Sequence, residues 1–236
     1  MNTHTFLASD DEQHYSDKCI ANTKDNVRHQ EASINNDCIV GDGNLRSCAL
    51  RFARLGDYRE AISLLNQLLK RNPENAIDYN NRGLIYYQCG ERQKAFHDYN
   101  TAIELNPKLA SAYNNRANYY AAYGNLAAAL DDYDEALNLN PTYTRAWINR
   151  GITLRDLGRY EESIDNFEVA QLFDQYEGHI LAERGRTYHL WGDWNWAIAD
   201  YRRALALLPM SQNHSDAAGW RLRLQVENWL GELLCS

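Results

Sequence analysis

The hydrophobic pattern of this chain repeats every 34 residues between positions 42 and 211. Large side chains occupy the fourth, eleventh and twenty-fourth positions of each block, and small residues occupy the eighth. In the second block these positions hold Tyr79, Tyr86, Tyr99 and Gly83. Large side chains that face small ones let neighbouring helices interdigitate. The pattern therefore predicts two packed helices in each block, over about positions 1–14 and about positions 17–30.

Glycine and proline mark the same period. A glycine follows the first predicted helix of every block, where a left-handed residue readily ends a helix, and a proline closes the second helix in four blocks. The blocks are 42–75, 76–109, 110–143, 144–177 and 178–211; the glycines are Gly56, Gly90, Gly124, Gly158 and Gly192; the prolines are Pro73, Pro107, Pro141 and Pro209, and Gln175 stands where a fifth proline is expected. Helices of roughly 21 Å are too short to be stable alone, so packing must hold them together.

The 34-residue period, with glycine and proline recurring at the helix ends, resembles that of the tetratricopeptide repeat family. The resemblance spans residues 42–211 and implies an all-α fold, a right-handed superhelical solenoid of five helix pairs. The repeat sequences NNRG and AIELNP are similar to those of bacterial members, and similar cyanobacterial and plastid members include photosystem assembly factors. An amphipathic run after the last block predicts a capping helix over 215–234, which covers the last apolar face of the solenoid. A dimer interface is the alternative use of that run.

Composition narrows the expected function. The formal net charge is −8, and no cluster of Lys and Arg offers the positive surface that nucleic-acid binding needs. Residues 1–40 are polar and acidic and predict a disordered arm, in which a short docking segment could lie. The five cysteines lack the spacing of a zinc site or a redox pair and indicate reduced thiols. Without a signal-peptide pattern or a long apolar run, we expect a cytoplasmic protein that does not span a membrane.

Charged residues recur in register with the predicted core. Arg occupies the seventh position of blocks two to five, and Asp or Asn occupies the twenty-third. In block one both are replaced together, by Cys48 and Leu64. Because an unpaired buried charge is costly, this joint replacement predicts that the two residues pair across the helices of one repeat. The expected structural ion pairs are Arg82 with Asp98, Arg116 with Asp132, and Arg184 with Asp200, and Arg150 faces Asn166.

The resemblance also implies that the first helix of each repeat lines a concave groove that binds a peptide. The groove positions hold Asn80, Asn81, Asn114, Asn115, Asn118, Asn149, Arg145, Arg155, Arg186 and Tyr87. Asparagine is a mediocre helix former, but its carboxamide can both donate to and accept from the backbone of an extended peptide. The ladder of Asn81, Asn115 and Asn149 at the sixth position looks like the one in O-linked N-acetylglucosamine transferase, whose transferase domain is absent here. The alternative is that these asparagines recur throughout the family for reasons unrelated to ligand binding.

The charge of these positions gives a further expectation. Five groove arginines stand against two carboxylates, a balance that favours a ligand segment with some acidic character. In related repeats a clamp of Lys, Asn and Arg holds the terminal carboxylate of heat-shock chaperones. That clamp is not matched here, because the second position of the blocks has no Lys and the sixth has no Arg.

The sequence predicts no catalytic residue, no cofactor and no metal site, since it has no nucleophile motif, phosphate-binding glycine loop or metal-spaced cluster. His179 and Glu183 share a helical face, but two ligands fall short of a metal site. Trp191 and Trp194 stand where residues usually pack between helices, so we expect them in the core. Trp196 stands at a usually exposed position and marks either a secondary interface or a residue beneath the capping helix.

From these features we predict a non-enzymatic scaffold or assembly adaptor that binds an extended segment of another protein in its groove. One alternative is a regulatory or photosystem-assembly-type helper that binds through Trp196 and the capping helix. Two others are a dimerising module and an enzyme or small-molecule sensor with a closed polar pocket. The sequence leaves the oligomeric state open.

Overall fold

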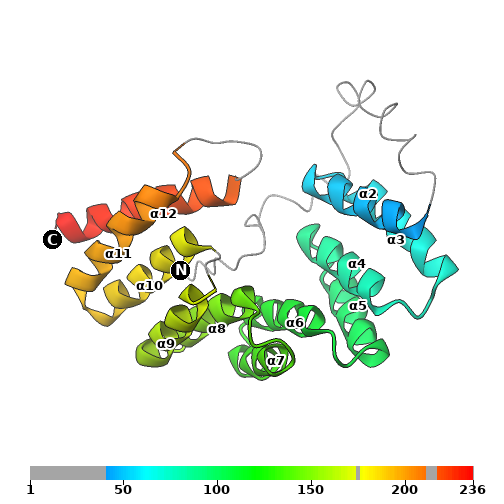
Figure 1. Ribbon diagram of the computed structural model, residues 1–236, viewed down its shortest axis with the longest axis horizontal. Helices are drawn as coiled ribbons and strands as arrows, with labels where there is room; N and C mark the ends of the chain where they lie inside the picture. The colour runs from blue at the N-terminus through cyan, green and yellow to red at the C-terminus, as the bar shows by residue number, and fades with distance from the viewer. Residues whose placement is uncertain (1–40, 174–175, 211–216, 236) are drawn as a thin grey trace. The chain divides into compact units, whose positions relative to one another are not determined.

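The computed structural model describes residues 41–173, 176–210 and 217–235. Within these ranges the chain forms eleven α-helices and no strand, which confirms the all-α prediction (Figure 1). The helices are α2 (Asp42–Arg54), α3 (Tyr58–Arg71), α4 (Ala76–Gln88), α5 (Arg92–Leu105), α6 (Ala110–Ala122), α7 (Leu126–Leu139), α8 (Thr144–Asp156), α9 (Tyr160–Gln171), α10 (Glu177–Trp191), α11 (Trp194–Leu207) and α12 (Ala217–Leu234). The predicted arm over 1–40 and Gln175 lie outside the described residues.

The turns between paired helices follow from two local signals. The glycine after each first helix has a positive φ, 81° at Gly56 and 93° at Gly192, a conformation that costs glycine little. The next helix often begins at a residue whose side chain accepts from a free backbone N–H. Asp57 accepts from the N–H of Glu60 at 3.2 Å, and Asn125 occupies the equivalent place before α7.

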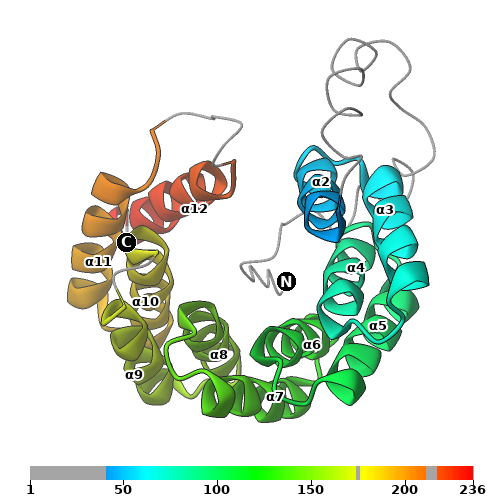
Figure 2. The ribbon, with the colours of Figure 1, turned by 45° about the vertical axis from the view of Figure 1, so that its right-hand side comes forward.

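The chain divides into two compact units with a boundary after Tyr119, within α6. The described part of the first unit covers residues 41–119. In it α2, α4 and the start of α6 lie on one face, which we call the inner face, and α3 and α5 lie behind them (Figure 2). The core of this unit joins α2 to α3 and includes Leu45, Ala49, Leu65 and Leu68.

The second unit begins at Tyr120 and continues to the end of the chain. Its inner face is formed by α8, α10 and α12, with α7, α9 and α11 behind them (Figure 2). Leu222 and Val226 of α12 are buried against α10 and α11. Arg223 donates to the carbonyl oxygens of Leu205 at 2.6 Å and Leu208 at 3.2 Å, which satisfies acceptors that the end of α11 leaves open.

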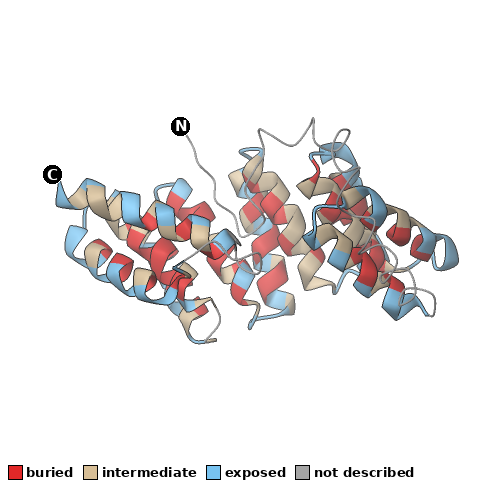
Figure 3. Ribbon diagram, turned by 90° about the horizontal axis from the view of Figure 1, so that it is seen from above, coloured by how far each residue is buried: buried red, intermediate tan, exposed pale blue. Residues whose placement is uncertain are grey.

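Within each helix pair, a small residue meets a large ring. A Cβ atom built on Gly83 would lie 2.8 Å from Cε1 of Tyr99, and one on Gly185 would lie 2.8 Å from Cδ1 of Tyr201. Both rings are buried, and in Figure 3 the buried residues gather where the helices of each unit face one another. The recurring aromatic positions therefore act as core, which is their predicted role.

One sequence-based expectation about the cysteines differs from the structure. Cys89 and Cys235 are free thiols, but Cys48 is disulfide-bonded, with its partner outside the described residues. The expectation of reduced thiols throughout is therefore wrong for Cys48. No described helix is both long enough and apolar enough to cross a membrane.

Candidate functional site

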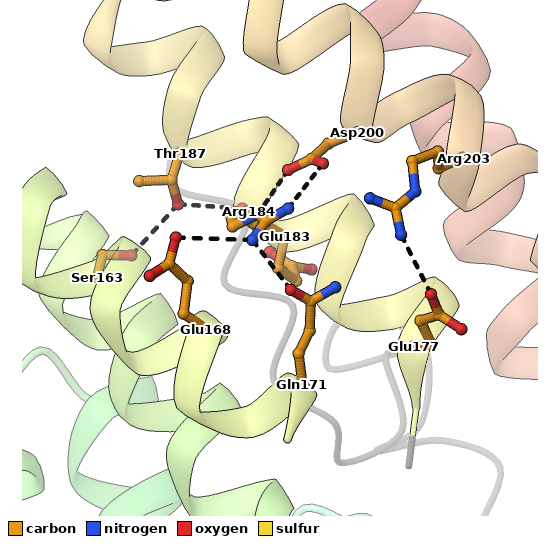
Figure 4. Close-up of polar contacts among 9 residues, drawn as sticks. All are labelled: Ser163, Glu168, Gln171, Glu177, Glu183, Arg184, Thr187, Asp200 and Arg203. Carbon is orange, nitrogen blue, oxygen red and sulfur yellow. Dashed lines mark hydrogen bonds and ion pairs between the residues drawn. The ribbon is translucent and has the colours of Figure 1, made fainter. Parts of the chain in front are cut away.

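Arginines at the seventh position of the blocks bind acidic residues across the helix pair. Arg82 donates from Nε and Nη2 to the two carboxylate oxygens of Asp98, at 2.7 and 2.8 Å. Arg184 does the same with Asp200, at 2.7 and 3.0 Å (Figure 4). The hydrogen bond to Asp200 raises the pKa of Arg184 above its usual value, against the opposing effect of burial. In the second unit Arg150 binds Asn166 at 3.1 Å, whereas the pair of Arg116 and Asp132 falls across the two units and stays a prediction.

The same arginines also donate hydrogen bonds to the preceding repeat. The sequence did not predict this contact. Each uses a further N–H to reach a polar side chain on the second helix of the preceding repeat. The pairs are Arg82 with Asn66 at 2.6 Å, Arg116 with Asn100 at 2.7 Å, Arg150 with Asp134 at 2.7 Å, and Arg184 with Gln171 at 3.0 Å. The polar residue at the twenty-fifth position was the available signal for the first three pairs, but its charge varies from block to block; Gln171 stands three positions later, and Glu168 at the twenty-fifth position lies 3.9 Å from Arg184. These arginines thus join successive repeats within each unit.

In the first unit, asparagines on the inner face bind one another. Asn115 of α6 donates to Oδ1 of Asn80 on α4 at 2.9 Å, and Asn80 donates in turn to Ser111 at 3.5 Å. Asn80 is buried, since only 5% of its surface is exposed. Asn80 and Asn115 therefore link two repeats, a structural role that the groove prediction did not include.

Asn81 is the asparagine of this face whose amide has no hydrogen-bond partner among the described residues. It is half-buried on α4, between Ile77 one turn before it and Leu84 one turn after it. Ile77 is 48% exposed. Tyr87 continues this side of α4 and meets Tyr119 edge to face at 6.5 Å between ring centroids. The inner face of α4 therefore presents one available amide within an apolar stripe.

Three other predicted groove asparagines are buried in the structure. Asn114, Asn118 and Asn149 are 3%, 5% and 1% exposed, so little of their surface is left for a ligand. The prediction that these three asparagines line a peptide-binding groove therefore needs correction. On α8 the physical reason is visible in the neighbours, because Ile148 and Ile152 beside Asn149 are also fully buried and this side of the helix packs inside the unit.

In the second unit the groove position of α10 carries a buried ion pair. Arg155 of α8 donates to Glu183 of α10 at 2.5 Å, and the two residues are 6% and 4% exposed. Burial alone would lower the pKa of Arg155, but the charge of Glu183 reverses that shift. Figure 4 labels Glu183 beside Arg184 and Thr187 on α10. Arg155 therefore supports the fold and is not an exposed groove cation, which corrects its predicted role.

Arg186, the next predicted groove arginine, is covered by α12. Its guanidinium lies 5.0 Å from the ring centroid of Trp229, and its Nη1 lies 3.7 Å from a carboxylate oxygen of Glu232. Beside it, burial and then the charge of Arg186 lower the pKa of His189 below its usual value. On α8, Arg145 is exposed, donates to the hydroxyl of Tyr176 at 2.9 Å and lies over that ring at 5.3 Å.

The tryptophans at the turn between α10 and α11 are exposed. Trp191, Trp194 and Trp196 are 51%, 56% and 58% exposed. The core assignment of Trp191 and Trp194 is therefore wrong. Trp196 stacks on Tyr188 at 6.1 Å and is not beneath α12, where Trp229 instead lies 5.9 Å from Tyr201. In the described ranges, no group of three or more His, Cys, Asp or Glu side chains could hold a metal ion.

The fold is that of a helical-repeat protein. Each helix pair packs a small residue against a large side chain, and arginines link successive pairs by hydrogen bonds. Models of the tetratricopeptide repeat match residues 52–75, 76–109, 110–143 and 132–165. The chain therefore belongs to the tetratricopeptide repeat family. Members of this family are generally protein-interaction modules, so the chain has the architecture of a protein–protein interaction scaffold. A search of curated proteins finds no match.

Solved structures show the same fold. A tetratricopeptide repeat protein of Thermus thermophilus, TTC0263, has 21% identity and a TM-score of 0.68, and the match covers 80% of this chain and 99% of that one. PilW, a type IV pilus biogenesis factor, has 22% identity and a TM-score of 0.67 over 81% of this chain and 90% of its own. MamA has 22% identity and a TM-score of 0.57, with 67% and 92% covered. At these identities the likeness concerns the fold.

Proposed function

We propose that this chain is a scaffold that holds an extended segment of another protein against the inner face of its first unit. The observation that carries the proposal is Asn81, a half-buried amide without a partner among the described residues, set between Ile77 and Leu84. A carboxamide can pair with both the N–H and the C=O of a peptide backbone. The apolar neighbours would bury alternate side chains of the same segment.

The surrounding helices extend this surface. Ser47 and Leu50 of α2 stand at the same repeat positions as Asn81 and Leu84 of α4. Ser47 is exposed and Leu50 is half-buried, so α2 offers a second polar and apolar pair beside the first. An extended segment that crosses α2 and α4 would therefore meet two similar pairs in succession.

Charge contributes less to the proposal than the sequence suggested. Arg46 binds Asp78 through two hydrogen bonds, Arg155 binds Glu183, and Arg186 lies near Glu232. Because carboxylates already neutralise three of the five groove arginines, an acidic ligand has less positive charge to meet. We therefore expect apolar side chains and a free backbone to matter more than acidic residues in the bound segment.

The test is selection of binding peptides from a random twelve-residue library displayed against the full chain, followed by affinity measurement. Asn81→Ala should weaken a selected peptide by about two- to tenfold, the range of one net hydrogen bond. Leu84→Ser should weaken it at least as much through lost apolar contact. Gln67→Ala, on the exposed side of α3, serves as the matched control. If neither Asn81→Ala nor Leu84→Ser changes the affinity of the selected peptides, this face is not the binding surface.

A further inference from the structure

Three tryptophans are exposed within six residues at the turn between α10 and α11 in the second unit. Trp191 ends α10, and Trp194 and Trp196 lie in the first turn of α11. Tryptophan is highly buried on average in proteins, and a cluster of exposed aromatic side chains indicates an interaction surface. We call these three residues the tryptophan turn.

The repeat architecture explains why the tryptophan turn is uncovered. Tyr160, which opens α9 in the fourth repeat, lies beside Trp191 with ring centroids 6.4 Å apart. Trp194 stands at the equivalent place in the fifth repeat and has no ring partner among the described residues. The following helix, α12, packs instead through Leu222 and Val226. No later repeat in the described chain takes the place beside Trp194.

Next to the rings, Asp193 offers a carboxylate that the protein itself does not use. Asp193 precedes α11 at the same repeat position as Asp57 and Asn125, whose side chains cap their helices. The Asp193 side chain makes no such capping hydrogen bond, and it has no ion-pair partner among the described residues. A pocket of about 360 Å³ opens to solvent here, lined by Trp191, Gly192, Asp193, Trp194 and Asn195. Two indole rings and one carboxylate thus converge on an open pocket.

Acidic side chains follow Tyr160, the ring neighbour of Trp191, along α9. Glu161 follows Tyr160 in α9, and Asp165 lies one helical turn further on; both are exposed and neither has an ion pair within the described ranges. Arg159, which directly precedes Tyr160, donates to Glu162 at 2.6 Å. The partial positive charge at the N-terminus of α11 opposes a bound cation, but it is limited to the first turn, where Asp193 offsets it.

We propose that the tryptophan turn binds arginine side chains of a basic segment in a partner protein. A guanidinium can stack on an indole face while it donates to the carboxylate of Asp193. The open pocket would leave most of a small free cation in water, whereas bound small molecules are usually largely enclosed, so a polypeptide is the better fit. The chain's own residues 1–40 carry three basic and seven acidic side chains, and a second copy has a net charge of −8, so neither is complementary. This surface is independent of the one on α4.

The test measures binding of three blocked peptides, (Gly-Arg)4, (Gly-Lys)4 and (Gly-Glu)4, to the full chain by calorimetry and by shifts of the indole N–H signals. We expect (Gly-Arg)4 to bind most tightly and (Gly-Glu)4 not to bind. Trp194→Ala should weaken (Gly-Arg)4 by roughly three- to thirtyfold. Asp193→Asn should weaken it by about fivefold and reduce the salt dependence of binding.

Matched controls separate local loss from general damage. Leu157→Ala changes the exposed residue that stands in the fourth repeat where Trp191 stands in the fifth, and Glu104→Gln removes an exposed carboxylate of the first unit. Both should bind (Gly-Arg)4 like the unchanged chain, and circular dichroism should show every variant folded. The proposal is overturned if (Gly-Glu)4 binds equally well, if free arginine amide binds as tightly as the peptide, or if Trp194→Ala abolishes self-association instead of peptide binding.

Discussion

The helices α4 and α10 are the first helices of the second and fifth repeats. They make the same kinds of contact with their partner helices but carry different residues on the inner face. Toward the partner helix, both place a glycine against a tyrosine ring and an arginine on an aspartate. On the inner face α4 has Ile77, Asn81, Leu84 and Tyr87, and α10 has His179, Glu183, Arg186 and His189 at the same positions. The repeat plan therefore fixes the pairing of helices and leaves the inner face free to vary.

The neighbours of each helix explain the difference. Glu183 meets Arg155 of the preceding repeat, but the residue equivalent to Arg155 in the first repeat is Ala53, which gives Asn81 no partner. Trp229 of α12 lies over Arg186 and closes that side of α10. The inner face of α10 is thus used by the fold, whereas that of α4 is available to a ligand.

The largest expected effect comes from the buried pair on α10. Glu183→Gln removes the closer of two carboxylates at the buried Arg155, which keeps Asp156 at 3.5 Å, and should lower the free energy of unfolding by about 3 kcal/mol, the low end of the range for breaking a buried pair. Asn81→Ala, the equivalent change on α4, should cost less than about 0.5 kcal/mol because that amide has no described hydrogen bond to lose. Urea denaturation followed by circular dichroism measures both. Equal costs would contradict the contrast between the two faces.

Removing the cover from α10 should have the next largest effect. Trp229→Ala deletes the ring that contacts Tyr201 and Arg186 and should cost about 2–3 kcal/mol, below the range for a fully buried tryptophan because Trp229 is partly exposed. Amide hydrogen exchange in α10 should accelerate at the same time. Leu234→Ala, on the exposed end of α12, is the control and should change neither quantity noticeably.

Packing within the helix pairs should respond alike in both helices. Gly83→Ala and Gly185→Ala each place a Cβ 2.8 Å from a buried tyrosine ring and should each cost about 1–3 kcal/mol. The first repeat pairs Ala49 with Leu65, so adding Tyr201→Leu to Gly185→Ala should relieve the clash. Thermal denaturation compares the variants. A large cost at one glycine alone would show that the two helix pairs are not packed alike.

The smallest effect concerns pH. Burial and the charge of Arg186 lower the pKa of His189 in the folded state, so the unfolded chain binds a proton more readily there. Stability should therefore rise with pH through the window below the unfolded value of about 6.5 and level off above it. Because His189 is only partly buried, the contribution should stay under about 1 kcal/mol. His189→Gln should flatten this part of a stability profile measured between pH 5 and 7.5.

Regular features of the sequence predicted the fold and part of the site. The glycines after the first helices adopt the expected left-handed conformation, and Arg82 and Arg184 contact the aspartates expected from the joint replacement in the first repeat. The reach of these arginines to the preceding repeat was not predicted, because the receiving residue is Asn66 in one block and Asp134 in another, with no constant charge.

Features that depend on the neighbouring helix could not be read from position alone. Asn80 and Asn81 are adjacent in sequence, but one is bound by α6 and the other is not. Trp191 is exposed like its equivalents Leu55, Tyr123 and Leu157, and Trp194 lies where the described chain provides no further repeat. A periodic pattern reports the average repeat, whereas these residues are set by what lies beside each copy.

The backward reach of the arginines bears on how such an array can change in length. In blocks two to four the arginine at the seventh position donates to the block before it, and blocks one to three hold the polar acceptor at the twenty-fifth position. If a whole block were duplicated in place, the copy would carry both the arginine and the acceptor. Each of them would meet its counterpart in the adjacent block. An insertion of any other length would shift the acceptor away from its cation, so gain and loss in steps of 34 residues is the route that keeps neighbouring blocks joined.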